Sequence, residues 1–247
     1  MKIKEIITAS TLFLAITFPV AATDKIPVDM ELVLSVDSSS SIDNDEYDLQ
    51  STGYANAFRD SEVISTITNL PLGLAVTMEL WTSESDTSMG WYHLKTESDV
   101  LAFANVLENF SRLTSSGTDI ELGVRTATNS LLNNNYQGEA LVIDVSGDGI
   151  SYYTDGCDVE MICPTLQSTR DNAVNQGIII NGLPINMPDG DSDWFEDRID
   201  EHYQLNVIGG EGSFIEVAED FSDFSRAVKA KILKEIVDNT PPSIYPD

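Results

Sequence analysis

The sequence has 247 residues, of which 42% are hydrophobic, enough for the core of one ordinary globular domain. It carries 41 acidic and 13 basic residues, and the resulting net charge of -28 repels phosphate backbones and anionic lipid surfaces. Nucleic acids and membrane surfaces are therefore not expected as partners, whereas cations are attracted.

The first 22 residues have the pattern of a signal peptide. Lys2 and Lys4 precede an apolar run from Ile6 to Phe18, and small residues follow in the segment PVAA. As a helix this run rises only about 20 Å, less than the roughly 30 Å hydrocarbon core of a membrane. We therefore expect residues 1–22 to direct export, to the periplasm or out of the cell. No later segment is long and apolar enough to span a bilayer.

The rest of the chain alternates short apolar runs with helical patterns. The run Met30–Val36 predicts a strand that is buried on both faces, and Asp43 predicts the N-cap of the helix that follows it. Leu72–Trp81 predicts the second strand, with Gly90–Leu94 beside it as a hairpin. Ser98 predicts the cap of the next helix.

The second half continues the alternation. Further strands are predicted at Ala140–Val145, at Ile178–Ile185 and, in the segment LNVIGG, at Leu205–Gly210; further helices are predicted at Ile120–Leu132, before Gly177, and from Phe221 to Ile236. This order requires crossover connections, so the predicted fold class is α/β, a doubly wound, mostly parallel central sheet with helices on both faces. One domain is predicted over residues 23–240, and a proline-rich tail over 241–247.

Oxygen-bearing side chains follow the predicted strand ends. In an extended segment Asp37, Ser39 and Ser41 share one side, while Ser38 and Ser40 point away. Thr118 stands just before a predicted helix, and Asp148 just after the third predicted strand. Ligands of such folds bind outside the carboxyl ends of the strands. Hydroxyls and carboxylates with few charges suit Mg²⁺, with Mn²⁺ next and Ca²⁺ after it.

The only two cysteines, Cys157 and Cys163, lie six positions apart. In an exported protein such a pair predicts a disulfide that closes a loop, and a zinc site would need more ligands. The two histidines, His93 and His202, are expected as surface or half-buried polar residues rather than as general bases.

Asp-x-Ser-x-Ser after the first strand, a Thr in a middle loop and Asp-Gly after a later strand resemble the metal-ion-dependent adhesion site of von Willebrand factor type A domains. The phrases ELVLSVDSSSSID, VIDVSGDG and VIGGEGSF are similar to a bacterial family of exported, uncharacterised proteins of that type. The resemblance implies that Ser39 and Ser41 bind the metal directly, Asp37 and Asp148 through water, and Thr118 in either way. Asp144 also precedes the Asp148 loop; the Asp-Gly pair favours Asp148 as the site residue, and Asp144 as a buried acid.

The resemblance implies a non-enzymatic protein-binding module that docks an Asp or Glu of a partner protein on the metal. Motifs of nucleophilic hydrolases and of nucleotide-binding loops are absent from the sequence, in agreement with this function. Two alternatives remain open. A metal-assisted hydrolase would need a general base such as Asp43 or Asp119, and a purely structural metal would serve folding alone.

Overall fold

The computed structural model describes residues 24–113, 117–150, 157, 161–186 and 198–239. The predicted signal peptide and the predicted tail over residues 241–247 lie outside the described residues. None of the helices in these ranges is both long enough and apolar enough to cross a membrane.

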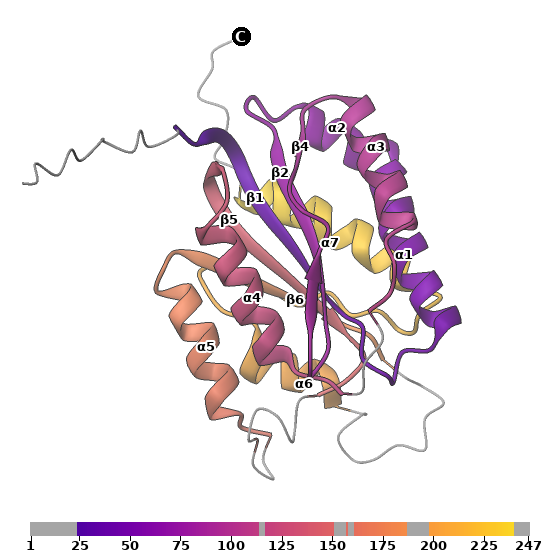
Figure 1. Ribbon diagram of the computed structural model, residues 1–247, viewed down its shortest axis with the longest axis vertical. Helices are drawn as coiled ribbons and strands as arrows, with labels where there is room; N and C mark the ends of the chain where they lie inside the picture. Colours follow the sequence, from indigo (N-terminus) through magenta and orange to yellow (C-terminus); the bar gives the residue numbers. More distant parts are fainter. Residues whose placement is uncertain (1–23, 114–116, 151–156, 158–160, 187–197, 240–247) are drawn as a thin grey trace, which may run out of the picture.

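A twisted, mostly parallel sheet forms the centre of the molecule (Figure 1). Its strands are β1 (Ile26–Asp37), β2 (Leu74–Trp81), β3 (Asp86–Ser88), β4 (Tyr92–Leu94), β5 (Tyr136–Gly147) and β6 (Ile178–Pro184). They follow the order β3-β2-β1-β5-β6, and β4 also pairs with β2. The strands β2, β1, β5 and β6 are parallel, while β3 and β4 run antiparallel to β2. The predicted parallel sheet and the predicted hairpin are both confirmed.

Helices cover both faces of the sheet (Figure 1). They are α1 (Asn44–Arg59), α2 (Ser61–Thr68), α3 (Glu97–Glu108), α4 (Ile120–Leu132), α5 (Pro164–Val174), α6 (Ile199–His202) and α7 (Phe224–Asn239). The helices α1, α2, α3 and α7 contact one another in one layer, and α4, α5 and α6 belong to the other. Each layer encloses its own apolar core against the sheet.

Strand β1 supplies both cores because successive side chains point to opposite faces. Met30, Leu32, Leu34 and Val36 belong to the core under α1 and α7, whereas Val33 belongs to the core under α4. The polar residues of β1 alternate with the first set, so they lie on the α4 face. This alternation decides the direction in which the last residue of the strand points.

Helix starts are set by local hydrogen bonds. Asp43 caps α1 as predicted, because its carboxylate accepts a hydrogen bond from Glu46 N at 2.9 Å, and Asp43 N in turn donates to the Glu46 carboxylate at 2.7 Å. The predicted cap of α3 at Ser98 is wrong. Thr96 caps that helix through Asp99, and Ser98 already lies in its first turn.

The predicted fifth strand at LNVIGG is also wrong. Residues Tyr203–Val207 form a π-helical turn, η2, that continues α6, and only Gly209 pairs with β6, at Ile180. Asn206 explains the difference, because its buried amide accepts from Cys163 N at 3.1 Å and donates to the Met161 carbonyl at 2.8 Å. An extended strand would not bring this side chain to the cysteine loop.

Cys157 and Cys163 form the predicted disulfide, with their Cα atoms 4.0 Å apart. His202 packs against it, with Nδ1 3.9 Å from the Cys163 sulfur and 3.2 Å from Asn206 Nδ2. The expectation of a surface or half-buried residue is wrong for His202, which is fully buried, and correct for His93. Burial lowers the pKa of His202 to about 4, so the imidazole is neutral near pH 7.

Three buried ionisable groups join α7 to β5. Lys231 Nζ lies 2.6 Å from an Asp144 oxygen and 2.5 Å from Glu235 Oε1, and all three side chains are fully buried. The amide of Asn181 on β6 donates to Glu235 at 3.0 Å. Burial raises the pKa of Asp144 to about 7. The charge of Lys231 lowers this pKa, and the charge of Glu235 raises it, because the two carboxyl groups share one ammonium.

We expect Lys231→Met to lower the free energy of unfolding by about 3 to 5 kcal/mol, because it leaves Asp144 and Glu235 buried without a counter-charge. Lys234→Met is the matched control on the same helix: Lys234 pairs with Asp238, and both side chains are nearly half exposed. Its loss should stay within about 1 kcal/mol. Urea denaturation of both variants measures the difference, and equal losses would contradict the assignment.

His202 predicts a loss of stability on acidification. Its pKa is about 4 in the folded protein and 6.5 in an unfolded chain, so the unfolded state binds the extra proton between these values. The contribution of His202 to the free energy of unfolding should fall by roughly 3 kcal/mol as the pH drops from 6.5 to 4. We expect His202→Gln to have a flatter profile over this range in urea denaturation. Parallel profiles of variant and wild type would refute the prediction.

Candidate metal site at the carboxyl ends of β1 and β5

The loop after β1 folds back over the end of the strand. The carboxylate of Asp37 accepts a hydrogen bond from Ser39 N at 2.8 Å, which forms a tight turn. The turn brings the Ser39 hydroxyl within 3.0 Å of the Ser41 hydroxyl. The Ser38 hydroxyl donates to the Leu113 carbonyl at 2.8 Å. Ser39 and Ser38 therefore point to different sides, as the sequence predicted.

Two other loops reach the same place. The Ser41 hydroxyl donates to Asp148 Oδ1 at 2.9 Å, and the Thr118 hydroxyl donates to the Ser39 oxygen at 3.2 Å. These loops follow β1, precede α4 and follow β5, and parallel pairing of β1 with β5 sets their approach. The structure therefore joins all five predicted site residues in one hydrogen-bonded group, with Asp37 connected through the Ser39 backbone.

Glycines allow this close approach. A Cβ atom at Gly149 would lie 3.1 Å from Thr118 Oγ1. A Cβ atom at Gly147 would lie 2.9 Å from Asp37 Cβ and 3.1 Å from the Tyr203 hydroxyl. The contact at Gly147 is closer than real Cβ atoms tolerate, so a side chain there would displace Asp37.

The two carboxyl groups of the site are buried close to each other. Burial, and next the charge of Asp148, raise the pKa of Asp37 well above its usual value, while the hydrogen bonds from Ser39 oppose this shift. Asp37 Oδ2 is buried and has no hydrogen-bond partner among the described residues. The site thus concentrates negative charge that the surrounding polar groups compensate only in part.

Arg112 supports the serine loop through hydrogen bonds to its backbone, and no sequence motif marks it. Its guanidinium donates to the Ser39 carbonyl at 3.0 Å, to the Ile42 carbonyl, and to Asn44 Oδ1 at 2.9 Å. Its charge also lowers the pKa of Asp37, although less than burial raises it. A lone arginine in a loop carries no sequence signal for this role, because its partners are backbone carbonyls of a distant loop.

Tyr203 is a second residue near the site that no sequence motif marks. Its hydroxyl is buried, close to the Cβ position of Gly147, without a hydrogen-bond partner among the described residues. Burial and the charges of Asp37, Asp148 and Asp144 raise the pKa of Tyr203 well above its usual value, so the phenol is neutral. It is the first residue of η2, just ahead of the segment in which the sequence predicted a strand.

The structure separates Asp144 from Asp148. Asp144 lies four residues earlier in the chain, about 13 Å away along β5, and faces α7, where Lys231 binds it. Asp148 lies beyond the strand end, bonded to Ser41. The expectation that Asp144 is a buried, partnered acid agrees with this placement.

The residues present fit a small divalent cation. A cation held octahedrally at about 2.1 Å keeps neighbouring ligand oxygens about 3.0 Å apart. The hydroxyl and carboxylate oxygens of Ser39, Ser41, Thr118 and Asp148 form three neighbouring pairs 2.9 to 3.2 Å apart. The described residues contain no group of three or more His, Cys, Asp or Glu side chains with metal-binding geometry, so hydroxyls would have to complete the set.

Solved structures share this fold at low sequence identity. The pilus adhesin SpaC from Lactobacillus rhamnosus GG, in its open conformation, is 15% identical with a TM-score of 0.63, over 86% of this chain and 30% of that chain. The vWF domain of the type V pili tip protein Mfa5 from Porphyromonas gingivalis is 10% identical with a TM-score of 0.62, over 88% and 98%. The VWA domain of SpRpn10 is 10% identical with a TM-score of 0.52, over 80% and 93%.

These similarities show that the fold is that of von Willebrand factor type A domains, as the sequence motifs implied. The chain spans about 30% of the length of SpaC, so the likeness covers one part of that adhesin. No curated protein matches the sequence. The model of the family described as "Protein of unknown function (DUF1194)" matches residues 27–240, and the chain belongs to that family.

Proposed function

We propose that the protein is an exported, non-enzymatic module that binds a partner protein through a divalent cation, Mg²⁺ or Mn²⁺, held at this site. The observation that carries the proposal is the group of oxygens from three separate loops, spaced as neighbouring ligands of one small cation. The adhesin and pilus-tip proteins that share the fold support a binding function without establishing it for this chain.

The side chains would have different roles in such a metal site. Ser39, Ser41 and Thr118 would offer neutral hydroxyl oxygens, while Asp37 and Asp148 would supply the negative charge around them. When bound, the cation supplies an electrophilic centre that an Asp or Glu side chain of a partner can ligate. Arg112 holds the backbone of Ser39 and Ile42 in place, so the hydroxyls are oriented before any ligand arrives.

The overall charge shapes the choice of partner. A net charge of -28 repels an acidic protein at long range, and salt at physiological strength screens this repulsion beyond about 8 Å. A partner with one protruding carboxylate on a neutral or basic surface therefore fits better than a uniformly acidic one. Binding to such a partner should depend on the divalent ion and only weakly on added salt.

The hydrolase alternative has less support. Its candidate general bases were Asp43 and Asp119, and both carboxylates serve as helix caps: Asp43 accepts from Glu46 N and Asp119 from Leu122 N, each at 2.9 Å. Both carboxylates therefore already have a structural role at a helix start. A purely structural metal would stabilise the fold without a bound partner, and partner capture in Mg²⁺ distinguishes this case.

We expect Asp37→Asn to abolish binding of Mg²⁺ or Mn²⁺ measured by calorimetry, and to raise the melting temperature of the protein in EDTA. The amide keeps the oxygen that accepts from Ser39 N but removes one of two mutually repelling buried charges. Ser39→Ala should also abolish metal binding, without the gain in melting temperature. Ser38→Ala is the matched control, since its hydroxyl points to Leu113 on the other side of the loop.

Wild-type protein on a resin should then retain a partner from the cell-envelope fraction of the source organism in Mg²⁺ but not in EDTA. The Ser39→Ala resin should retain nothing in either buffer. Metal-induced stabilisation without a retained partner would support a structural metal instead. Absence of any heat with Mg²⁺ or Mn²⁺ would refute the metal site itself.

A further inference from the structure

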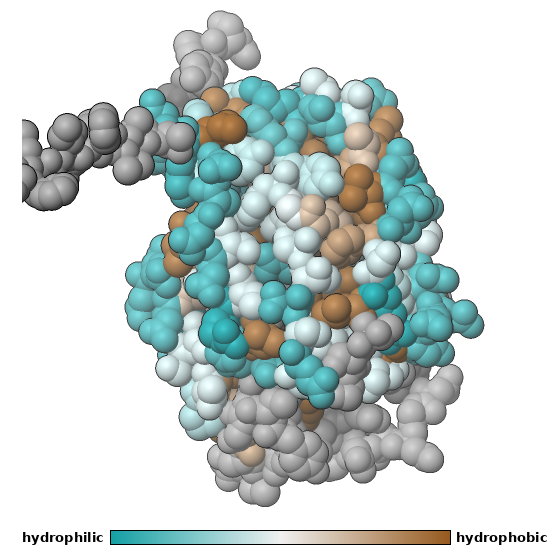
Figure 2. Space-filling view, viewed as in Figure 1, coloured by the Kyte–Doolittle hydropathy of each residue, from teal (hydrophilic) through white to brown (hydrophobic). Residues whose placement is uncertain are grey.

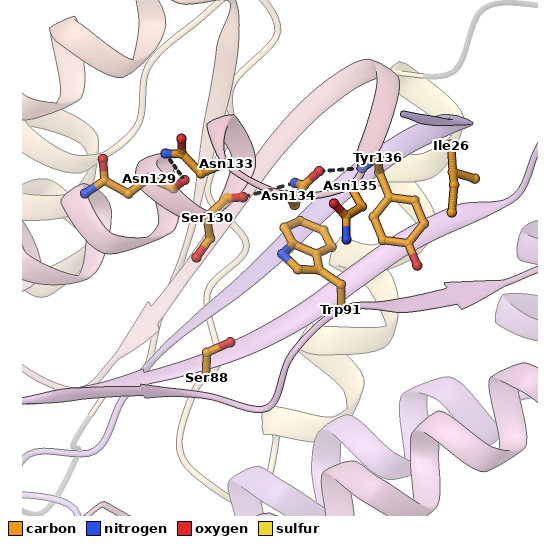
Figure 3. A pocket seen from close by; sticks show the side chains of 9 residues that line it. All are labelled: Ile26, Ser88, Trp91, Asn129, Ser130, Asn133, Asn134, Asn135 and Tyr136. Atoms are coloured by element: carbon orange, nitrogen blue, oxygen red, sulfur yellow. Dashed lines mark hydrogen bonds between the residues drawn. The ribbon is translucent and has the colours of Figure 1, made fainter. Parts of the chain in front are cut away.

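A second site lies at the opposite end of the sheet. An open pocket of about 630 Å³ lies where β1 and β5 begin, between the last turn of α4 and the segment from β3 to β4 (Figure 3). Its lining runs from Ile26, at the start of β1, to Ser88 on β3, and includes none of the five residues of the candidate metal site. The pocket is therefore separate from the candidate metal site.

The chemistry of the lining is unusual for this chain. Its nine residues are four asparagines, two serines, Trp91, Tyr136 and Ile26, and none carries a charge. Yet the protein as a whole has 41 acidic residues. In Figure 2 the middle of the face between α4 and α1 is covered mainly by residues of intermediate hydropathy, with strongly hydrophilic residues toward both sides. The lining disfavours ions and matches a neutral, polar ligand.

Two aromatic rings form one wall. The rings of Trp91 and Tyr136 have centroids 6.0 Å apart and are tilted by 48°. His93 also packs against Tyr136, with centroids 5.7 Å apart, and its Nε2 lies 2.8 Å from the Leu72 carbonyl oxygen. Both Trp91 and Tyr136 remain partly exposed. Aromatic faces held in this way offer apolar surface to a ligand at small entropic cost.

Buried acids behind the pocket fix its polar wall. Asn134 donates to Glu31 on β1 and to the Ser130 carbonyl, and its Oδ1 accepts from Tyr136 N at 2.7 Å. The Ser130 hydroxyl donates to Glu79 on β2. Glu31 and Glu79 are both buried. The turn from α4 to β5 is thus anchored to two strands, and its shape is set before a ligand binds.

Free amide groups face the solvent on this fixed turn. Asn129 and Asn135 are exposed, and their side-chain amides make no hydrogen bond with any residue that the structure describes. Each amide offers two donors and one acceptor. Figure 3 shows Asn135 between the Trp91 and Tyr136 side chains, so donors, acceptors and aromatic faces lie together.

We propose that this pocket binds a neutral oligosaccharide. A sugar ring presents C–H groups that pack on aromatic faces, and neighbouring hydroxyls that match the paired donor and acceptor of an amide. The uncharged lining selects against sialylated, sulfated and uronic-acid glycans, which the acidic surface also repels. Because the pocket is open, a bound sugar would keep part of its surface in solvent.

The test begins with a printed array of neutral and acidic glycans, probed with full-length protein in EDTA so that the metal site does not contribute. We expect binding to neutral glycans only. The strongest hit is then titrated as a soluble oligosaccharide, with tryptophan fluorescence and saturation-transfer NMR as readouts. Asn129→Ala, Asn135→Ala and Trp91→Ala should each weaken binding at least tenfold.

Asn109→Ala is the matched control, since Asn109 is an exposed asparagine at the end of α3, outside the pocket lining. It should bind like wild type, as should Ser39→Ala, which disables only the metal site. The two exposed asparagine variants keep the test valid if Trp91→Ala fails to fold. No binding to any neutral glycan, binding to acidic glycans alone, or unchanged binding by both asparagine variants would overturn the proposal.

Discussion

The polar side of β1 is the feature on which the rest of the molecule depends. Glu31, Ser35 and Asp37 alternate along the strand on the α4 face, where most of the surroundings are apolar. Each one finds a partner: Glu31 binds Asn134 and Gly138, Ser35 accepts from the Trp81 indole at 2.9 Å, and Asp37 accepts from Ser39 N. A buried polar group without a partner costs stability, so these bonds specify how the neighbouring segments must lie.

The polar residues at the two ends of this set, Glu31 and Asp37, support different candidate sites. At the amino end, Glu31 holds the turn between α4 and β5, which forms the uncharged pocket. At the carboxyl end, Asp37 holds the serine loop, and the register with β5 brings Asp148 beside it. Between them the Trp81 indole packs against Gly123 of α4, where no side chain would fit. One strand therefore positions both candidate sites while the middle of the sheet stays closely packed.

Local patterns in the sequence were enough to predict much of this arrangement. Apolar runs identify β1, β2, β5 and β6, because a strand covered on both faces must be apolar almost throughout. The spacing of Asp37, Ser39 and Ser41 predicts their common side from the alternation of an extended segment. In the structure a turn closed by the Ser39 N–H and the Asp37 carboxylate brings the Ser39 and Ser41 hydroxyls together. Asp43 likewise caps α1 through a residue three positions away. In each case the residues that interact are close together in the sequence.

Features made by distant contacts escaped prediction. Arg112 acts on carbonyls of residues 39 and 42, and η2 forms because Asn206 bonds to Met161 and Cys163. Neither partner is near in sequence, and the apolar segment LNVIGG has the composition of a strand. The pocket beside α4 also depends on distant contacts. In the sequence its asparagines have the composition of an ordinary polar turn, and only the fold brings β1 and the segment before β4 next to them.

The contact among Gly147, Asp37 and Tyr203 has a consequence for the evolution of this family. A methyl group at position 147 would press on the Asp37 side chain and on the Tyr203 hydroxyl at once. These positions come from β5, β1 and η2, and a larger residue at position 147 fits only if the side chain at position 37 or 203 makes room. Lineages that replace the glycine should therefore also have lost the tyrosine or the aspartate, and with the aspartate the loop geometry that it imposes.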